Sequence, residues 1–327
     1  MVRIDSSRLA ELCGVSRGTV DRALNGRGEV NVATKARILR MAEKHGYKPN
    51  RLGRALVTGK TMTIGLIVLN LDNSFFAHLV SSVETKAREH GYMTLLALSH
   101  NDLVTERQCI DFFASHAVDG LIMLPLGNGT AYEKHLTAHG IPSVMIGNRL
   151  SKRWTYIGID ERAAMNDLIR HVAGKGYCHL IYYAPPLRHR GAVNLFAQEE
   201  RYQGFIDAAD AVNTLSHETV IDNTDMVTKV RSLMKKKRTA VICSNDIFAI
   251  DVIRQLTDAG ISVPRDAGVT GFDNIEASGY FSPRITTIEY PTGDIGEAAI
   301  DAVLKKITNK KAEDILCTTR LIDGNSL

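Results

Sequence analysis

The residues with the clearest recognition chemistry in this chain are polar side chains at the start of a predicted helix, Arg17–Leu24. Ser16 is the expected N-cap, and the helical period turns Val20 and Ala23 toward a hydrophobic core. The opposite face exposes arginines and small polar residues, which can bond base edges in the major groove of DNA. The candidate DNA contacts in this segment are Ser16, Arg17, Gly18, Thr19, Arg22 and Asn25.

A second group of polar residues follows the ends of predicted strands, where open parallel sheets bind their ligands. The segment Asn70–Phe76 joins a polar loop to two aromatic residues. This combination suits a sugar, because amides and carboxylates bond hydroxyl groups while aromatic rings cover C–H faces. A hydrophobic core accounts equally well for Phe75 and Phe76, and we expect Asp246, after another strand, to cap a helix.

Three patterns that would indicate an enzyme are incomplete. Gly53–Thr61 resembles a phosphate-binding P-loop, but five residues separate its first two glycines where the motif needs four, and a strand follows it. The glycine pairs at 26–28 and 127–129 lack the third glycine of a dinucleotide-binding fingerprint. Neither Ser16 nor Ser244 stands in a G-x-S-x-G sequence. We therefore expect no enzymatic activity and no cofactor.

Cysteines and histidines give no sign of a metal site. The five cysteines are scattered, odd in number and without a C-x-x-C pair, which is typical of reduced thiols in a cytoplasmic protein. We expect four of the histidines to be surface or loop residues that share no metal-ligand spacing with a carboxylate. These are His100, His116, His135 and His139. Charged residues interrupt the N-terminus, so we expect no signal peptide, and no apolar run is long enough to span a membrane.

Charge divides the chain into a basic head and a mildly acidic body. Residues 1–60 contain thirteen Lys and Arg against five Asp and Glu, a net charge of +8. The whole chain carries +4, so residues 61–327 carry −4. This asymmetry predicts a head that binds phosphates and a body that does not bind polyanions.

Two further helices are expected to position the recognition helix. The first has Asp5 or Ser6 as its N-cap and ends in a turn at Gly14, and the third begins after Asn31 and ends at Gly46. Their apolar faces are formed by Leu9, Ala10, Leu12 and Cys13 in the first helix and by Ile38, Leu39 and Ala42 in the third. An ordinary helical hairpin with solvated charges explains the first two helices alone, but the third helix and the basic segment after it favour a helix-turn-helix module.

From residue 62 on, apolar runs alternate with amphipathic helical patterns, which indicates parallel sheets covered on both faces. Strands are expected at 63–69, 93–99, 120–124, 143–147 and 156–159, with helices at 77–90, 104–114 and 131–139. A second round has strands at 180–184, 218–221, 240–244 and 268–272, with helices at 161–174, 199–211, 225–234 and 246–258. Two rounds predict an α/β body of two doubly wound parallel-sheet lobes with a ligand cleft between them.

The order of several motifs resembles the lactose-repressor/galactose-repressor family of bacterial transcription factors. The motifs are A-x-x-x-G-V-S at 10–16, T-V-x-R-x-L-N at 19–25, G-Y-x-P-N at 46–50, A-L at 55–56 and T-I-G-L-I-V at 63–68. The resemblance continues to the C-terminus. It implies a periplasmic-binding-protein-like body whose chain crosses between the lobes three times, near residues 158–161, 289–293 and 318–321.

In that family, the segment matching Pro49–Val57 is a hinge that becomes helical when two protomers bind the operator, and a leucine then enters the minor groove. Leu56 matches that leucine, and Gly53 lowers the helix propensity of the hinge away from DNA. The alternative is that Leu52, Leu56 and Val57 belong to the core of the N-terminal module. The further candidate DNA contacts are Tyr47, Asn50, Arg51 and Leu56.

The resemblance also implies ligand-binding roles in the cleft. Arg201 matches a ligand-binding arginine, Asn245 and Asp273 match the N-D and G-F-D motifs, and Asn148 stands where many relatives have an aspartate. The candidate effector contacts are Asp72, Phe75, Phe76, Arg149, Arg201, Asn245, Asp273 and Tyr290. The loop at 185–200 is longer than in relatives, which places Asn194, Phe196 and Gln198 to enlarge or reshape the pocket.

These inferences predict a cytoplasmic, nucleoid-associated bacterial regulator with a helix-turn-helix domain at 1–48 and a linker at 49–61. Residues 62–327 form the effector-binding and dimerisation domain, with lobe 1 at about 62–159 and 293–318 and lobe 2 at about 160–290 and 320–327. We expect a homodimer or higher oligomer that binds double-stranded operator DNA, represses carbohydrate-use genes and responds to a sugar or sugar derivative. A purine or other metabolite as effector, and a sugar-binding module without DNA function, are the alternatives.

Overall fold

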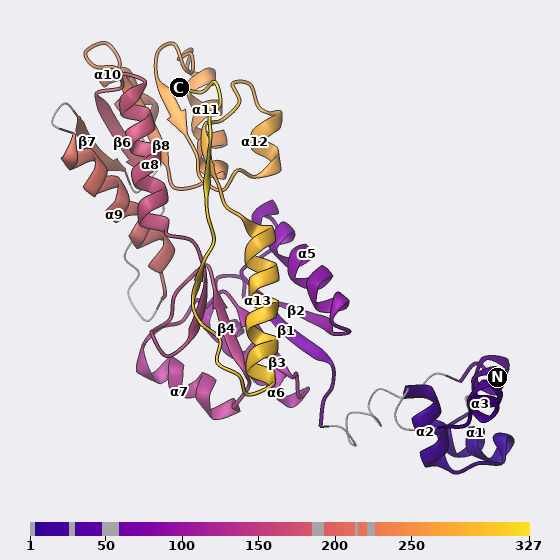
Figure 1. Ribbon diagram of the computed structural model, residues 1–327. Helices are drawn as coiled ribbons and strands as arrows, with labels where there is room; N and C mark the ends of the chain where they lie inside the picture. Colours follow the sequence, from indigo (N-terminus) through magenta and orange to yellow (C-terminus); the bar gives the residue numbers. More distant parts are fainter. Residues whose placement is uncertain (1–3, 26–29, 48–58, 185–192, 213–214, 221–225) are drawn as a thin grey trace. The chain divides into compact units, whose positions relative to one another are not determined.

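The computed structural model describes residues 4–25, 30–47, 59–184, 193–212, 215–220 and 226–327. The chain forms two compact units, Met1–Thr61 and Met62–Leu327 (Figure 1). The predictions for Asn50, Arg51, Leu56 and the rest of the hinge lie outside the described residues. Within the described part of the chain, no helix combines the length and the apolar character that a membrane crossing requires.

The described residues of the first unit form the helices α1 (Ser6–Cys13), α2 (Arg17–Asn25) and α3 (Val32–Lys44). Asp5 caps α1 by accepting a hydrogen bond from the backbone of Arg8 at 2.8 Å, and Asn31 caps α3. The buried core consists of Leu9, Ala10, Cys13, Val20, Ala23, Ile38 and Ala42. Leu12 and Leu39, predicted to share the apolar faces, are 37% and 45% exposed because they stand at the edges of their helical stripes.

The first lobe of the second unit is built on a parallel sheet in the order β11-β5-β4-β3-β1-β2. Its strands are β1 (Thr63–Val68), β2 (Met93–Leu98), β3 (Gly120–Met123), β4 (Ser143–Ile146), β5 (Thr155–Gly158) and β11 (Ile315–Leu316). Helices α5 (Ser74–Glu89) and α13 (Thr292–Ile307) cover one face. Helices α6 (Leu103–Ser115) and α7 (Gly129–His139) cover the other, so the lobe is doubly wound.

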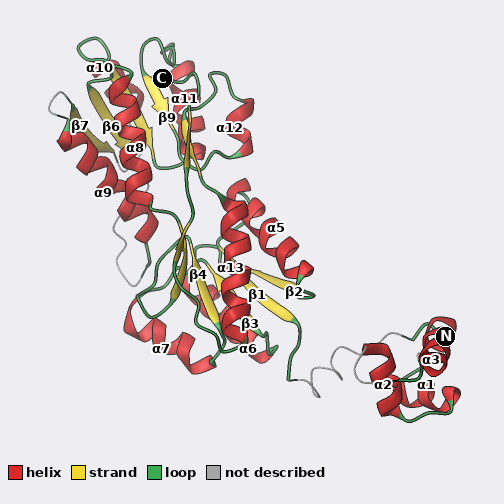
Figure 2. Cartoon of the chain, viewed as in Figure 1, coloured by secondary structure: helices red, strands yellow, loops and turns green. Residues whose placement is uncertain are grey.

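The second lobe repeats this plan with a parallel sheet in the order β7-β6-β8-β9 (Figure 2). Its strands are β6 (His179–Tyr183), β7 (Ser216–Val220), β8 (Thr239–Cys243) and β9 (Gly268–Thr270). Helices α8 (Glu161–Gly174) and α9 (Phe196–Ala211) pack on one face. Helices α10 (Met226–Leu233) and α11 (Asp246–Asp258) pack on the other, and the short α12 spans Glu276–Tyr280.

The chain passes between the lobes three times, at the positions that the sequence predicts. The first crossing joins β5 to α8. The other two run on either side of α13, through β10 (Thr287–Glu289) and β12 (Arg320–Ile322), which pair antiparallel. Because all three crossings lie together, polar residues at the strand ends of both lobes face one cleft.

Candidate functional site

In the first unit, the start of α2 is fixed by Ser16. Its hydroxyl oxygen accepts a hydrogen bond from the backbone N–H of Thr19 at 3.1 Å and lies 2.9 Å from the Thr19 hydroxyl. Its carbonyl oxygen accepts from the N–H of Val20 at 3.1 Å. Ser16 is therefore the N-cap that the sequence predicts, and its side chain is engaged by the helix.

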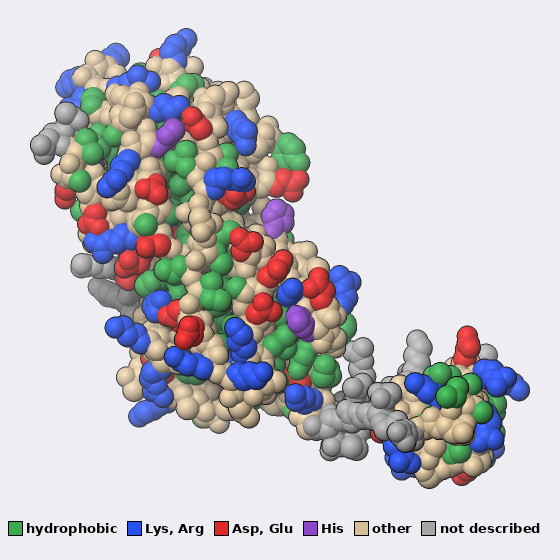
Figure 3. Space-filling view, viewed as in Figure 1, with side chains coloured by type: hydrophobic (Ala, Val, Ile, Leu, Met, Phe, Trp, Pro, Cys, Tyr) green, Lys and Arg blue, Asp and Glu red, His purple; other side chains and the backbone are tan. Residues whose placement is uncertain are grey.

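The outer face of α2 is open to solvent at Arg17, Gly18 and Arg22. The Arg22 guanidinium folds back along the helix, with Nε 3.3 Å from the Gly18 carbonyl and Nη2 3.4 Å from the Thr19 hydroxyl. A Cβ added at Gly18 would meet only the Ser16 hydroxyl, at 3.8 Å. This face therefore has room for a bulky partner, and basic side chains are spread over the visible surface of the unit (Figure 3).

Tyr47, another candidate DNA contact, is half-buried and packs against the helical core. Burial raises the pKa of its hydroxyl, and a hydrogen bond with Ser6 partly offsets that rise. Tyr47 thus helps to close the core formed by α1, α2 and α3. Of the remaining candidate DNA contacts, Asn25 is the last residue of α2.

In the second unit, a cavity of about 580 Å³ lies between the two lobes. It is lined by aromatic rings, by a ring of amide side chains and by three charged residues. The polar lining residues are Asn70, Asn73, Asn101, Asn148, Asn194, Gln198, Asn245, Glu161, Arg201 and Asp273. The aromatic lining residues are Phe75, Phe76, Phe248 and Tyr290.

Arg201, on α9, is the centre of this site and is only 5% exposed. Its Nε donates to Glu161 at 2.7 Å, and its Nη1 donates to the Ser244 carbonyl at 2.8 Å. Its Nη2 lies 3.3 Å from a carboxylate oxygen of Asp273. The guanidinium also stacks 3.9 Å from the centre of the Phe272 ring. These contacts hold one cation rigidly between two carboxylates from different elements.

The carboxylates outnumber the cation, and burial shifts their pKa values upward. Burial raises the pKa of Asp273 to about 8 and that of Asp246 to about 7, although Arg201 opposes both shifts. The pKa of Glu161 is raised by burial for the same reason. Burial therefore makes each of these carboxyl groups hold its proton to a higher pH than it does in water.

The backbone at Asp273 is held in an uncommon conformation, with φ of +106°, and Asn274 follows with φ of +52°. Asp246 fixes this turn, because its carboxylate accepts from the Thr287 hydroxyl at 2.7 Å and from the Ile275 backbone at 2.8 Å. A Cβ at Gly271 would lie 2.0 Å from that carboxylate, so glycine is required there. The strain is compensated by this network and aims Asp273 into the cavity.

Several polar atoms in the cavity wall are shielded from solvent and have no hydrogen-bond partner among the described residues. They are Glu161 Oε1 and Gln198 Oε1, together with the neighbouring Ser244 Oγ. Buried polar groups are normally satisfied, and leaving one unsatisfied costs about 1–3 kcal/mol. These atoms lie behind the surface of the cavity, whereas the amide side chains on that surface are suited to a ligand rich in hydroxyl groups.

The structure brings six of the eight predicted effector residues to this cavity: Phe75, Phe76, Arg201, Asn245, Asp273 and Tyr290. Asp72 is exposed in the loop before α5 and is not part of the lining. Arg149 is not part of it either, because its guanidinium pairs with Asp314 at 2.8 Å and lies over the Tyr156 ring. The prediction that Asp246 caps a helix is wrong, since Asn245 caps α11 by accepting from the Phe248 backbone at 3.0 Å.

Sequence reasoning missed Glu161, Asn101 and Phe248 as lining residues, whereas Asn70 and Asn73 belong to the polar loop that it associated with a sugar. Glu161 gave one signal in the sequence, since it is an acidic residue at the start of a helix that directly follows a strand.

The expectation that His135 and His139 share no metal-ligand spacing with a carboxylate is also wrong. The two histidines stand one helical turn apart on α7 and both contact Asp111 of α6.

Comparison with known proteins agrees with both units. Residues 9–50 match the bacterial regulatory proteins of the lacI family, and residues 169–327 match a periplasmic binding protein-like domain. The HTH-type transcriptional repressor PurR of Aliivibrio fischeri (strain MJ11) is 30% identical over 319 residues, which cover 93% of this chain and 92% of that protein.

Two solved structures show the same fold. A periplasmic binding protein/LacI transcriptional regulator from Alkaliphilus metalliredigens QYMF, complexed with D-xylulofuranose, has a TM-score of 0.71 at 25% identity over 81% of this chain and 98% of that one. The lac repressor dimer bound to operator and the anti-inducer ONPF has a TM-score of 0.85 at 18% identity, with 99% of each chain covered. The chain described here therefore belongs to the lacI family of bacterial regulatory proteins and is a DNA-binding transcriptional regulator.

Proposed function

We propose that this protein is a repressor whose affinity for operator DNA is set by an uncharged sugar bound between the lobes of the second unit. The observation that carries the proposal is the cavity of about 580 Å³, which is lined by amide side chains and by aromatic rings. A sugar has hydroxyl groups for the first and C–H faces for the second. The D-xylulofuranose complex of the regulator from A. metalliredigens supports this ligand class.

The charges in the cavity favour a neutral sugar over a phosphorylated or acidic one. Among the described residues, Arg201 is the one cationic side chain in the lining, and it already pairs with Glu161 and Asp273. An anionic ligand group would compete with these two carboxylates for a single guanidinium and would be repelled by them. Neutral hydroxyl groups meet no such penalty.

A purine or another planar metabolite is the second candidate. Phe75 stands edge-on to Phe76 and to Tyr290, with ring centres 5.1 and 5.0 Å apart, and Phe248 lies in the same lining. Such rings also stack on a planar base.

In the first unit, we infer that Arg17, Thr19 and Arg22 read base edges while Ser16 fixes the start of the helix. The exposure of Arg17 and Arg22 supports this assignment, and the half-buried Thr19 hydroxyl lies 3.4 Å from the Arg22 guanidinium. Helix-turn-helix regulators read palindromic operators as two-fold symmetric dimers, so a homodimer is part of the proposal. The effector then acts by binding one lobe arrangement more tightly than the other.

A thermal-shift screen of neutral sugars, sugar phosphates, acid sugars and purines tests the ligand class, because a ligand that binds only the native state raises its Tm. We expect neutral sugars to give the shift. A shift with purines alone selects the second candidate, and a shift only with sugar phosphates or acid sugars contradicts the charge argument.

The assigned site is tested by calorimetric titration of the selected ligand. Asp273→Ala removes a buried partner and should weaken ligand binding about ten- to a hundredfold, while operator affinity without ligand is unchanged. Asp72→Ala is the matched control, since Asp72 is exposed and outside the lining. Unaltered ligand affinity in both Asp273→Ala and Arg201→Ala would reject the site but not the DNA-binding role.

A further inference from the structure

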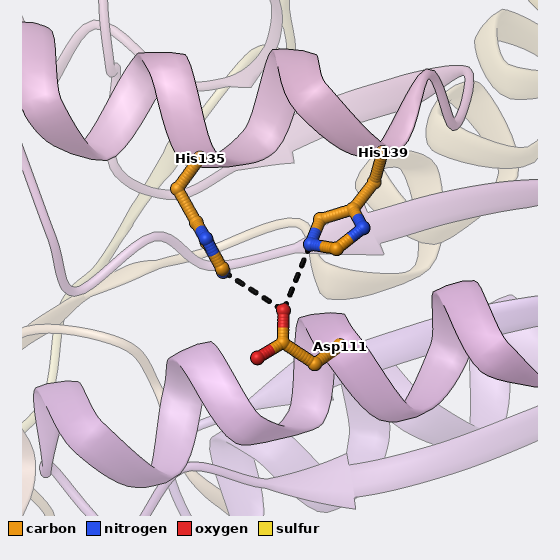
Figure 4. A group of neighbouring side chains, drawn as sticks. All are labelled: Asp111, His135 and His139. Atoms are coloured by element: carbon orange, nitrogen blue, oxygen red, sulfur yellow. Dashed lines mark hydrogen bonds and ion pairs between the residues drawn. The ribbon is translucent and has the colours of Figure 1, made fainter.

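Asp111, His135 and His139 form a compact group on the first lobe, and none of them lines the effector cavity (Figure 4). The histidines are four residues apart on α7, so their side chains stand on one face of that helix, and Asp111 faces them from α6. Paired histidines at this spacing are a recurrent way to present two imidazoles to one metal ion.

The distances place three ligand atoms around one point. Nε2 of His139 lies 2.8 Å, and Nε2 of His135 3.2 Å, from the same oxygen of Asp111. One ligand atom from each residue lies within 4.8 Å of the others. Ligands of a tetrahedral Zn²⁺ stand roughly 3.4 Å apart at Zn–N and Zn–O distances near 2.1 Å. A small outward movement of the two rings therefore makes room for the ion.

Two further features suit a metal ion. The Nε2 atom of His135 is shielded from solvent and, within the described part of the chain, makes no hydrogen bond of good geometry despite its closeness to Asp111. The side chains themselves remain 27%, 25% and 55% exposed for His135, His139 and Asp111. An ion can thus enter from solvent, and water can complete its coordination.

We propose that Asp111, His135 and His139 bind one divalent transition-metal ion, with Zn²⁺ as the best fit, and that the ion joins α6 to α7. Two imidazole nitrogens and one carboxylate oxygen suit Zn²⁺, whereas Mg²⁺ and Ca²⁺ prefer oxygen ligands. Because the ion bridges two helices on one face of the first sheet, its binding stabilises that lobe without occupying the effector cavity.

The test uses the full chain without a histidine tag, stripped of metal by a chelator and titrated with ZnCl₂ in a calorimeter. We expect one equivalent to bind and Zn²⁺ to raise the Tm, while MgCl₂ does neither. His135→Gln, His139→Gln and Asp111→Asn should each weaken Zn²⁺ binding at least tenfold. His217→Gln is the matched control: its Nε2 contacts Asp210 at 2.9 Å and it is also 25% exposed, but among the described residues no second histidine forms a metal-ligand group with that carboxylate.

Wild-type protein gives an independent readout that does not depend on the folding of a variant. Zn²⁺ should protect His135 and His139, but not His217, from modification by diethyl pyrocarbonate, as mapped by peptide mass spectrometry. Absence of one-equivalent binding, equal protection of His217, or unchanged binding in a folded His135→Gln/His139→Gln variant would each overturn the proposal.

Discussion

At the scale of single residues, the effector site depends on carboxyl groups whose burial is only partly compensated. Arg201 pairs with Glu161 and Asp273, while Asp246 bonds the turn behind them. Each carboxyl group is less easily ionised in the folded protein than in the unfolded chain, because burial disfavours its charge. The pKa of such a group therefore links stability to pH.

We predict that Asp273 makes the unliganded protein less stable as pH rises. The pKa of this group is raised from 3.8 to about 8 on folding, so the native state binds more protons than the unfolded state between these values. Its contribution is fully present below pH 4 and is lost as pH rises through 8, with a slope of at most about 1.4 kcal/mol per pH unit.

Urea unfolding between pH 5 and pH 8 measures this effect. Asp273→Asn cannot ionise, so its stability should fall less steeply with pH than that of the wild type. Asp258→Asn alters a 69% exposed carboxylate and serves as the control. Parallel curves for wild type and Asp273→Asn would show that Asp273 ionises normally in the fold.

A second residue-scale prediction concerns Arg22. Replacement by alanine should weaken binding to the specific operator by about 1–3 kcal/mol if the guanidinium pairs with a base edge. Operator sites selected from random DNA, followed by titration at fixed salt, give the measurement. Equal weakening on operator and random DNA would instead identify Arg22 as a phosphate contact.

At the scale of elements, the segment before α9 connects the two lobes. The Asn194 backbone N–H donates to the Leu126 carbonyl at 2.7 Å, and its side-chain amide donates to the Arg149 carbonyl at 3.1 Å. Asn148, in the first lobe, donates a hydrogen bond from its side-chain amide to the Asn194 carbonyl. Its side-chain oxygen accepts a hydrogen bond from the Ala197 backbone N–H. These bonds hold one arrangement of the lobes around the cavity.

We predict that Asn194→Ala loosens this connection. The change leaves the Arg149 carbonyl and the Phe196 N–H without their partner, which should lower the free energy of unfolding by about 1–3 kcal/mol. Amide hydrogen exchange should accelerate at 126–127 and 193–197. Gln203→Ala, which removes an exposed bond to Asp207, should change neither region. Unchanged exchange in Asn194→Ala would mean that the connection does not depend on this side chain.

The elements also show how far the sequence determines the structure. Helix α11 begins and ends where its apolar period predicts, at 246 and 258, and the predicted strand boundaries deviate by a few residues. Helix α5 begins at Ser74 rather than 77 because Asn73 caps it. Helix α13 was not predicted. The paired strands β10 and β12 were not predicted either, since short strands that cross between lobes carry little local pattern.

The candidate site was less predictable than the fold, because its members meet only through long-range contacts. Both Asp273 and Arg149 follow strands, but Asp273 lines the cavity whereas Arg149 pairs with Asp314, 165 residues away. Likewise, the spacing of His135 and His139 was visible in the sequence, but the carboxylate between them comes from the preceding helix. Side-chain direction and distant partners decide such roles, and local periodicity does not encode them.

At the scale of the whole molecule, the proposed DNA and effector sites belong to separate units of one chain, and any coupling between them must be reciprocal. If the effector changes operator affinity by some factor, the operator must change effector affinity by the same factor. Allosteric couplings in proteins are typically about 5–150-fold. The direction of the change identifies the effector as an inducer or a corepressor.

We predict equal factors in the two titrations of the wild-type protein. One measures operator binding by fluorescence anisotropy with and without saturating effector, and the other measures effector binding by calorimetry with and without operator. Arg22→Ala should weaken only the first intrinsic affinity, and Asp273→Ala only the second, because the two residues belong to different compact units. Unequal factors would show that a further equilibrium, such as dissociation of the dimer, accompanies one of the two binding events.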